Sequence, residues 1–214
     1  MTSLRVWSVN VARPGVIGQR HGTDVWSAIG KAPVTGDSVE LGWLNLSGDD
    51  QADRSVHGGI DKGVYVYPGE HHPRWRSAGI PAAPGLLGEN LTTEGLTEED
   101  VHLGDHFTWG PCELVVTQPR TPCYKLALHL RRPDIARLMI DSGASGWYLR
   151  VLRTGTVAIG EPMRRTVHRA ELPTIHDVFA WTIRTPREPG NIRRLLAVPE
   201  LASQYAQGLT KLGS

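Results

Sequence analysis

Short stretches in which apolar and polar residues alternate recur along the chain. Alternation, or enrichment in β-branched and aromatic residues, marks the ranges 4–11, 38–46, 63–67, 112–118, 146–152 and 156–159. Gly-Asp pairs at 36–37, 48–49 and 104–105 are turn signals between them. Many short strands with such turns predict a mainly β protein, either a barrel or a sandwich. The range 63–67 is too short to separate a strand from the first turn of a helix.

Helical patterns interrupt the strands at about residues 70–78 and 133–140, and three more follow residue 165. Thr174 precedes IHDVFAWTI, Asn191 precedes IRRLLAV, and Pro199 opens PELASQYAQGL, so each has a suitable cap or start. The part of the chain after residue 165 is too short to form a stable hydrophobic core of its own with any margin. We therefore expect a barrel domain at residues 1–165 and a three-helix extension at 166–214, packed on the barrel or on a second subunit.

Composition narrows the class of protein. The 214 residues contain 23 Lys plus Arg and 22 Asp plus Glu, a net charge of +1, so no global charge favours a nucleic-acid or membrane partner. No apolar run approaches the roughly 18 residues of a membrane span, and the start MTSLRVWSVNVARPG lacks a secretion-signal pattern. We expect a cytoplasmic protein. Two cysteines are too few for a disulfide framework.

The charge is unevenly distributed, and one cysteine lies in the basic part. Residues 114–165 carry 9 basic and 3 acidic side chains, and the segment QPRTPCYK (118–125) lies among them. Pro119 and Pro122 stiffen this connection, and nearby cations such as Arg120 would favour a thiolate at Cys123. The residues alone leave open whether Cys123 is a metal ligand or nucleophile, or a buried inert thiol. Cys112 has no basic flank, and we expect it to be inert.

Three further segments contain candidate binding residues. In QADRSVHGGIDK (51–62), Gly58 and Gly59 could form an anion-binding turn beside Lys62, or an ordinary turn, and His57 could be an acid, a base or a structural residue. GENLTT (88–93) suits either a polar ligand or a turn. Arg150 stands among apolar residues, so it either pairs with an acid or faces an anionic ligand.

Several cofactor motifs are missing from the sequence. No H-E-x-x-H or paired-cysteine spacing occurs, so a zinc site would need ligands that only the fold brings together. The chain likewise has no phosphate-binding P-loop and no dinucleotide fingerprint. We expect no zinc, flavin or iron–sulfur cluster in this chain.

Four ordered motifs together resemble one known family. QAD…HGG.DK (51–62), GENLTT (88–93), QPR.PC.K (118–125) and GWYLRVL..G.V..G (146–160) closely resemble the MOSC domain, named for the C-terminal domain of molybdenum cofactor sulfurase. The helical tail resembles the extension of its YiiM-like branch, the N-hydroxylaminopurine resistance proteins. Gly63 stands where a small apolar residue is expected, and Thr121 occupies a variable position.

The resemblance implies a MOSC-type β-barrel with a few inserted helices, which binds the molybdenum cofactor through a bond from Cys123 to the metal. It implies reduction of N-hydroxylated compounds at the N–O bond, with electrons from a separate flavin or iron–sulfur reductase. The residues expected to act in catalysis are Cys123 and His57. Those expected to bind the cofactor are Gly58, Gly59, Asp61, Lys62, Asn90, Arg120, Tyr124, Lys125 and Arg150.

Two alternatives to the enzyme are a carrier protein and a nucleic-acid-binding module. The chain could instead carry sulfur on Cys123 as a persulfide, or hold the cofactor for handover, without turnover. The second alternative is a nucleic-acid-binding module, but we expect neither a nucleic acid nor a membrane as partner. The helical tail could be a docking surface for the reductase or a structural element. The sequence leaves the substrate and the formation of a homodimer open.

Overall fold

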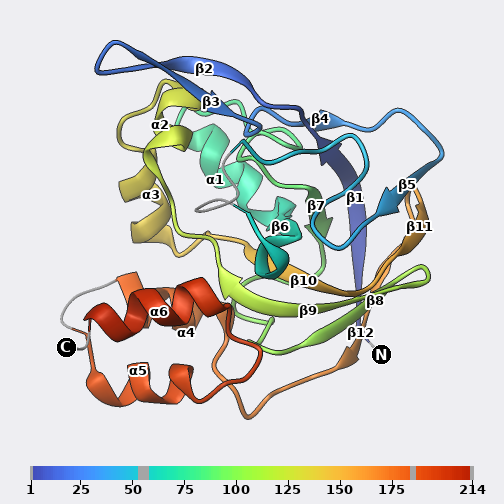
Figure 1. Ribbon diagram of the computed structural model, residues 1–214, viewed down its shortest axis with the longest axis vertical. Coiled ribbons are helices and arrows are strands. Elements are labelled where there is room, and N and C mark those ends of the chain that lie inside the picture. The colour runs from blue at the N-terminus through green and yellow to red at the C-terminus, as the bar shows by residue number, and fades with distance from the viewer. Residues whose placement is uncertain (1, 53–57, 184–186, 213–214) are drawn as a thin grey trace.

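The computed structural model describes residues 2–52, 58–183 and 187–212 (Figure 1). Its strands are β1 (Ser3–Val11), β2 (Gly15–Arg20), β3 (Thr23–Ser27), β4 (Ala32–Pro33), β5 (Ser38–Leu41), β6 (Val64–Pro68), β7 (Leu91–Glu94), β8 (His106–Trp109), β9 (Cys112–Pro119), β10 (Trp147–Arg153), β11 (Gly155–Ala158) and β12 (Met163–Val167). Its α-helices are α1 (His72–Ser77), α2 (Tyr124–Leu130), α3 (Ile135–Ser142), α4 (Ile175–Ile183), α5 (Pro189–Leu196) and α6 (Ser203–Leu212). Two short 3-10 helices are η1 (Ile60–Lys62) and η2 (Gly69–His71).

Within the described residues, seven strands close into a β-barrel. The ring runs β12-β8-β9-β10-β6-β7-β1, and β1 closes it by pairing with β12. All neighbours are antiparallel except β6 and β7, which are parallel. Alternate side chains point inward, and Phe107, Trp109 and Trp147 are fully buried in the barrel core. These large rings fill a small barrel, so the barrel is a packed core and the binding sites must lie outside it.

The expected mainly β fold is confirmed, with differences in single elements. The ambiguous stretch at 63–67 is a strand, β6. The predicted strand at 38–46 ends early, since β5 stops at Leu41 and the Gly42 amide then donates to the Asn45 carbonyl at 2.9 Å. The alternation pattern does not mark the hairpin of β2 and β3, because their side chains lie mostly at the surface and carry little periodic signal.

A second core lies on the outer face of the barrel, where α1, α2 and α3 pack beside β6 (Figure 1). Tyr65, Tyr67 and Trp75 are buried there, and the Trp75 indole donates to the Tyr67 hydroxyl at 2.5 Å. Leu126 anchors α2 in this cluster. The packing fixes the first turn of α2, and with it Cys123, against the barrel wall.

The three C-terminal helices lie together beside the barrel, in red and orange in Figure 1. Val178, Ile192, Leu195 and other apolar residues of the tail form a cluster that includes Leu103, in the turn before β8. Ile175, the first residue of α4, is buried in the barrel core itself. The tail therefore packs directly on the barrel. None of the described helices combines the length and the apolar character that a membrane crossing requires.

Candidate functional site

A pocket lies where β9 gives way to α2. Its volume is about 650 Å³ when the space at its solvent-open mouth is included. Cys123, the residue just before α2, lines this pocket. Its backbone is extended, at φ −130° and ψ 165°, and the residue is half-buried. The lining residues are Ser27, Ala28, Ile29, Lys31, Asp49, Asp50, Gln51, Ala52, Lys62, Tyr65, Leu87, Gly88, Asn90, Arg120, Cys123, Lys125 and Tyr148. Five of the predicted site residues thus share one pocket: Lys62, Asn90, Arg120, Cys123 and Lys125.

The Arg120 guanidinium is a buried cation at this pocket. The residue is 5% exposed and follows β9 directly. Its Nη1 lies 3.7 Å from the Met139 sulfur, its Cζ lies 5.4 Å from the centre of the Tyr65 ring, and it also interacts with the Tyr148 hydroxyl. Among the described residues no carboxylate comes within ion-pair distance of Arg120. A buried charge without a counter-ion costs several kcal/mol, so this guanidinium suits an anionic ligand in the pocket.

Lys31 and Asp49 form a buried ion pair in the pocket wall. Asp49 Oδ1 also accepts from the Ala12 amide at 2.9 Å, and Oδ2 accepts from Asn90 Nδ2 at 2.8 Å. Burial lowers the pKa of Lys31, and the negative charge of Asp49 opposes that shift. Lys31 is therefore a better proton donor than an exposed lysine would be.

Asn90 holds the pocket wall together. Its Oδ1 accepts from the Tyr65 amide at 3.1 Å, and its Nδ2 donates to the Asn10 carbonyl at 3.3 Å as well as to Asp49. Because Asn90 joins the loop before β7 to β1, β6 and the Asp49 turn, it fixes the position of Asp49. The Asn90 side chain is already hydrogen-bonded within the protein before any ligand binds.

Two more lysines line the pocket. Lys62, at the end of η1, lies 3.5 Å from Gln204 Oε1, and burial lowers its pKa despite the neighbouring Asp61. The Lys125 ammonium donates to the Trp26 carbonyl at 3.1 Å. With Arg120 and Lys31, they give the pocket lining four cationic side chains against the two carboxylates of Asp49 and Asp50, a net charge of +2.

Asp61 and Arg150 pair with each other outside the pocket lining. Arg150 Nη2 lies 2.7 Å from Asp61 Oδ1, and Asp61 Oδ2 accepts from the Ser203 amide at the start of α6 at 2.8 Å. Arg150 also donates to the Glu200 carbonyl at 3.2 Å. Of the two readings of Arg150, pairing with an acid is the one observed. The pair fastens the helical tail to η1, directly beside Lys62.

The remaining predicted residues lie at other positions. Tyr124 is 45% exposed, outside the pocket lining, with the Arg20 guanidinium 4.3 Å from its ring centre. Gly59 has φ +96°, as an anion-binding turn would allow, but neither it nor Gly58 lines the pocket. His57 lies outside the described residues. Cys112 is buried in the barrel core, and burial raises the pKa of its thiol, in keeping with the expected inert role.

Several residues that line the pocket had no predicted site role, among them Lys31, Asp49, Tyr65 and Tyr148. Asp49 stands in a Gly-Asp turn, Tyr65 in an ambiguous strand, and Tyr148 in the fourth family motif, but none of these signals assigned it to the site. Lys31 precedes the short strand β4 in a stretch without periodicity. The only local signal was the polar character of Lys31 and Asp49, which most surface residues share.

Comparison with known proteins gives the class to which this barrel and pocket belong. The family model described as MOSC domain matches residues 53–164. The chain therefore belongs to the MOSC domain family, as the four motifs indicated.

Individual relatives narrow the likeness further. The chain is 38% identical over 190 residues to Protein YiiM of Escherichia coli strain K12, covering 86% of this chain and 84% of that protein. It is 35% identical over 145 residues to a protein of Gibberella moniliformis named Reductase, covering 65% of this chain and 26% of that one. The crystal structure of YiiM from Geobacillus stearothermophilus superposes with a TM-score of 0.82 at 29% identity, over 99% of this chain and 100% of the other. The resemblance to the YiiM-like branch, C-terminal helices included, is confirmed.

Proposed function

We propose that this protein is a molybdenum-cofactor-dependent reductase that cleaves the N–O bond of N-hydroxylated compounds. The observation that carries the proposal is the buried Arg120 guanidinium, which lines the same pocket as the Cys123 thiol and has no carboxylate partner among the described residues. A soft thiolate suits molybdenum, and a phosphate-bearing pterin needs cationic donors. The name of the fungal relative, Reductase, is in keeping with a reductive role.

The residues of the pocket fit the cofactor in kind. The Cys123 thiolate would bind the metal, while Arg120, Lys62 and Lys125 would bind the anionic part of the pterin. When bound, the cofactor would supply two electrons. Together with two protons, these electrons convert an N-hydroxylamine to an amine and water. This chain would supply the binding site, the orientation and a source of protons.

Lys31 is the residue we assign to proton delivery. Its ammonium lines the pocket and is held by Asp49, so the Nζ proton has a fixed position. Burial lowers its pKa, which makes release of that proton easier at neutral pH. The buried tyrosines of the wall are poorer donors, since burial raises the pKa of Tyr65 and Tyr148. The negative charge of Asp49 would favour the protonated form of Lys31 before the proton is transferred.

Reloading with electrons requires a second protein. We propose a flavin or iron–sulfur reductase as the donor and the cytoplasm as the place of action. A carrier that holds sulfur on Cys123, or hands the cofactor on, would need the same thiol but no turnover. Reduction of an N-hydroxylated purine with a chemical electron donor distinguishes the two functions, because only an enzyme turns over repeatedly.

The test uses protein made in a host that synthesises the cofactor. We expect bound pterin and molybdenum together with repeated turnover of the N-hydroxylated purine. Arg120→Gln should lose at least tenfold in bound pterin, because the charge that binds the anion is gone. Arg132→Gln is the matched control, since Arg132 pairs with Asp134 at 2.9 Å at the surface. Pterin content in Arg120→Gln equal to that of wild type would contradict the proposed binding mode. Absence of turnover in cofactor-loaded wild type would contradict the proposed enzyme.

A further inference from the structure

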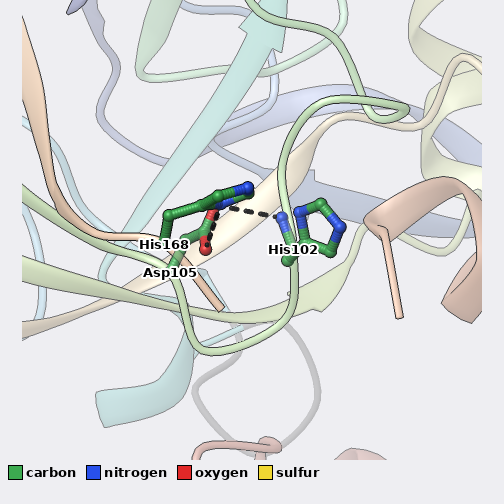
Figure 2. A group of neighbouring side chains, drawn as sticks. All are labelled: His102, Asp105 and His168. Atoms are coloured by element: carbon green, nitrogen blue, oxygen red, sulfur yellow. Dashed lines mark hydrogen bonds and ion pairs between the residues drawn. The ribbon is translucent and has the colours of Figure 1, made fainter. Parts of the chain in front are cut away.

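Two histidines and an aspartate from two separate segments lie close together (Figure 2). His102 and Asp105 belong to the turn that precedes β8, and His168 is the first residue after β12. Their nitrogen and carboxylate oxygen atoms all lie within 4.8 Å of one another. No spacing motif in the sequence marks this group, because 63 positions separate His168 from Asp105. The fold alone brings the three side chains together.

The donor atoms have the character of a metal site. Nδ1 of His102 is buried and has no hydrogen-bond partner in the described part of the chain, although buried ring nitrogens are normally paired. The His102 and His168 rings meet edge to face with their centres 4.7 Å apart. Two imidazoles and one carboxylate are the donor set of many three-ligand zinc sites.

The distance between His168 and Asp105 is also compatible with a shared cation. His168 Nδ1 lies 3.2 Å from Asp105 Oδ1 and 3.4 Å from Oδ2, which is long for a hydrogen bond to a carboxylate. Ligands about 2.0–2.1 Å from a tetrahedral zinc ion are about 3.3 Å apart. A small movement of the exposed His168 side chain would therefore admit the ion between the two atoms.

Other groups around Asp105 decide which oxygen could bind the ion. Oδ2 accepts from the His102 amide at 3.1 Å and from Arg165 Nη1 at 3.2 Å. Oδ1 accepts from the Arg169 amide at 2.7 Å, which leaves it one further position. The Arg169 side chain is directed to Glu171 and Glu200. Arg165 opposes a cation, but it also holds the carboxylate in place with Oδ1 facing His168.

We propose that His102, Asp105 and His168 bind one Zn²⁺ ion, with water as the fourth ligand. The His168 side chain is 41% exposed, so solvent can reach the open position. The ion would join the turn before β8 to the start of the segment that leads from β12 to α4. It would therefore act as a clamp between the barrel and the helical tail, separate from the Cys123 pocket and independent of the proposed reductase activity.

Direct binding of Zn²⁺ to the full chain tests the proposal. The protein is freed of metal with a chelator and titrated with Zn²⁺ by calorimetry, and Co²⁺ replaces Zn²⁺ for absorption spectroscopy. The Cys123→Ala background removes a competing thiol. We expect one Zn²⁺ per chain, tetrahedral Co²⁺ bands, and a rise in melting temperature of about 5 °C at a hundredfold excess over the dissociation constant.

Single histidine variants locate the site. His102→Ala and His168→Ala should each weaken Zn²⁺ binding at least tenfold and abolish the rise in melting temperature. His129→Ala, in α2, is the matched control and should bind as the parent does. His168 lies at the surface, so its variant should fold even if His102→Ala does not. No stoichiometric Zn²⁺ binding by the parent, or unchanged binding in His168→Ala, would overturn the proposal.

Discussion

Arg150 of β10 forms an ion pair with Asp61 of η1, with 2.7 Å between Nη2 and Oδ1, and the same carboxylate receives the amide of Ser203 at the start of α6. Two residues from motifs that identify the family thus attach the helical tail to the barrel. They do so beside Lys62, which lines the pocket. The tail and the pocket are consequently linked through one short 3-10 turn.

Breaking this pair should loosen the tail. Asp61→Ala leaves the Arg150 guanidinium partly buried without a carboxylate, and should lower the free energy of unfolding by about 1–3 kcal/mol. Chemical denaturation measures the change. Glu113→Ala is the control, because its pair with Arg153 is exposed on both sides and should contribute less than about 1 kcal/mol. Equal losses in the two variants would contradict the structural role of Asp61.

Gly146 contacts the pocket residue Arg120, and its position excludes any side chain. Its φ is +64°, and a Cβ atom would lie 2.3 Å from the Val66 carbonyl oxygen. The Gly146 carbonyl accepts from the Arg120 amide at 3.2 Å, so a displaced Gly146 would move Arg120. We expect Gly146→Ala to destabilise the fold by more than about 2 kcal/mol, because the clash adds to the conformational cost.

Gly160→Ala separates the two contributions. Gly160 has φ +88° with open space around it, so its variant should show the conformational cost alone, about 1–2 kcal/mol. Thermal or chemical unfolding of both variants provides the comparison. A Gly146→Ala protein as stable as Gly160→Ala would show that the close approach to Val66 is unimportant.

The buried Lys31 should leave a signature in the pH dependence of stability. Burial lowers its pKa in the folded state below the ordinary value of 10.5. The unfolded chain therefore binds more protons between these two pKa values, and stability contributed by this group rises with pH in that window. The difference in unfolding free energy, wild type minus Lys31→Met, should grow as pH rises from 7 towards 10. A difference that stays constant or shrinks would contradict a lowered pKa.

How far the sequence could predict this molecule depends on the range of the interactions involved. Local alternation predicted strands such as β9 and β10, because burial on one face of a strand leaves a period of two. The Gly-Asp signal at 48–49 was local too, but the contact of Asp49 with Lys31 joins two separate loops. The same holds for Asp105, whose partner His168 comes from beyond β12.

Candidate chemistry was predictable where a motif is contiguous. Cys123, Arg120 and Lys125 lie within six residues of one another, and all three line the pocket. For Arg150, the sequence allowed a ligand or an acid as partner, and only the fold brings Asp61 within reach across 89 positions. Side-chain pairing over such distances has no periodic signal, so it had to come from the structure.

The central claim is that the Cys123 thiolate binds molybdenum in this pocket, and metal content tests it most directly. Wild type, Cys123→Ala and the control Cys112→Ala are purified from the same cofactor-producing host, and molybdenum per chain is determined by elemental analysis. Cys112 lies in the barrel core, away from the pocket. We predict near-stoichiometric molybdenum in wild type and Cys112→Ala, and a loss of at least tenfold in a folded Cys123→Ala protein. Molybdenum retained at the wild-type level in Cys123→Ala would contradict the claim.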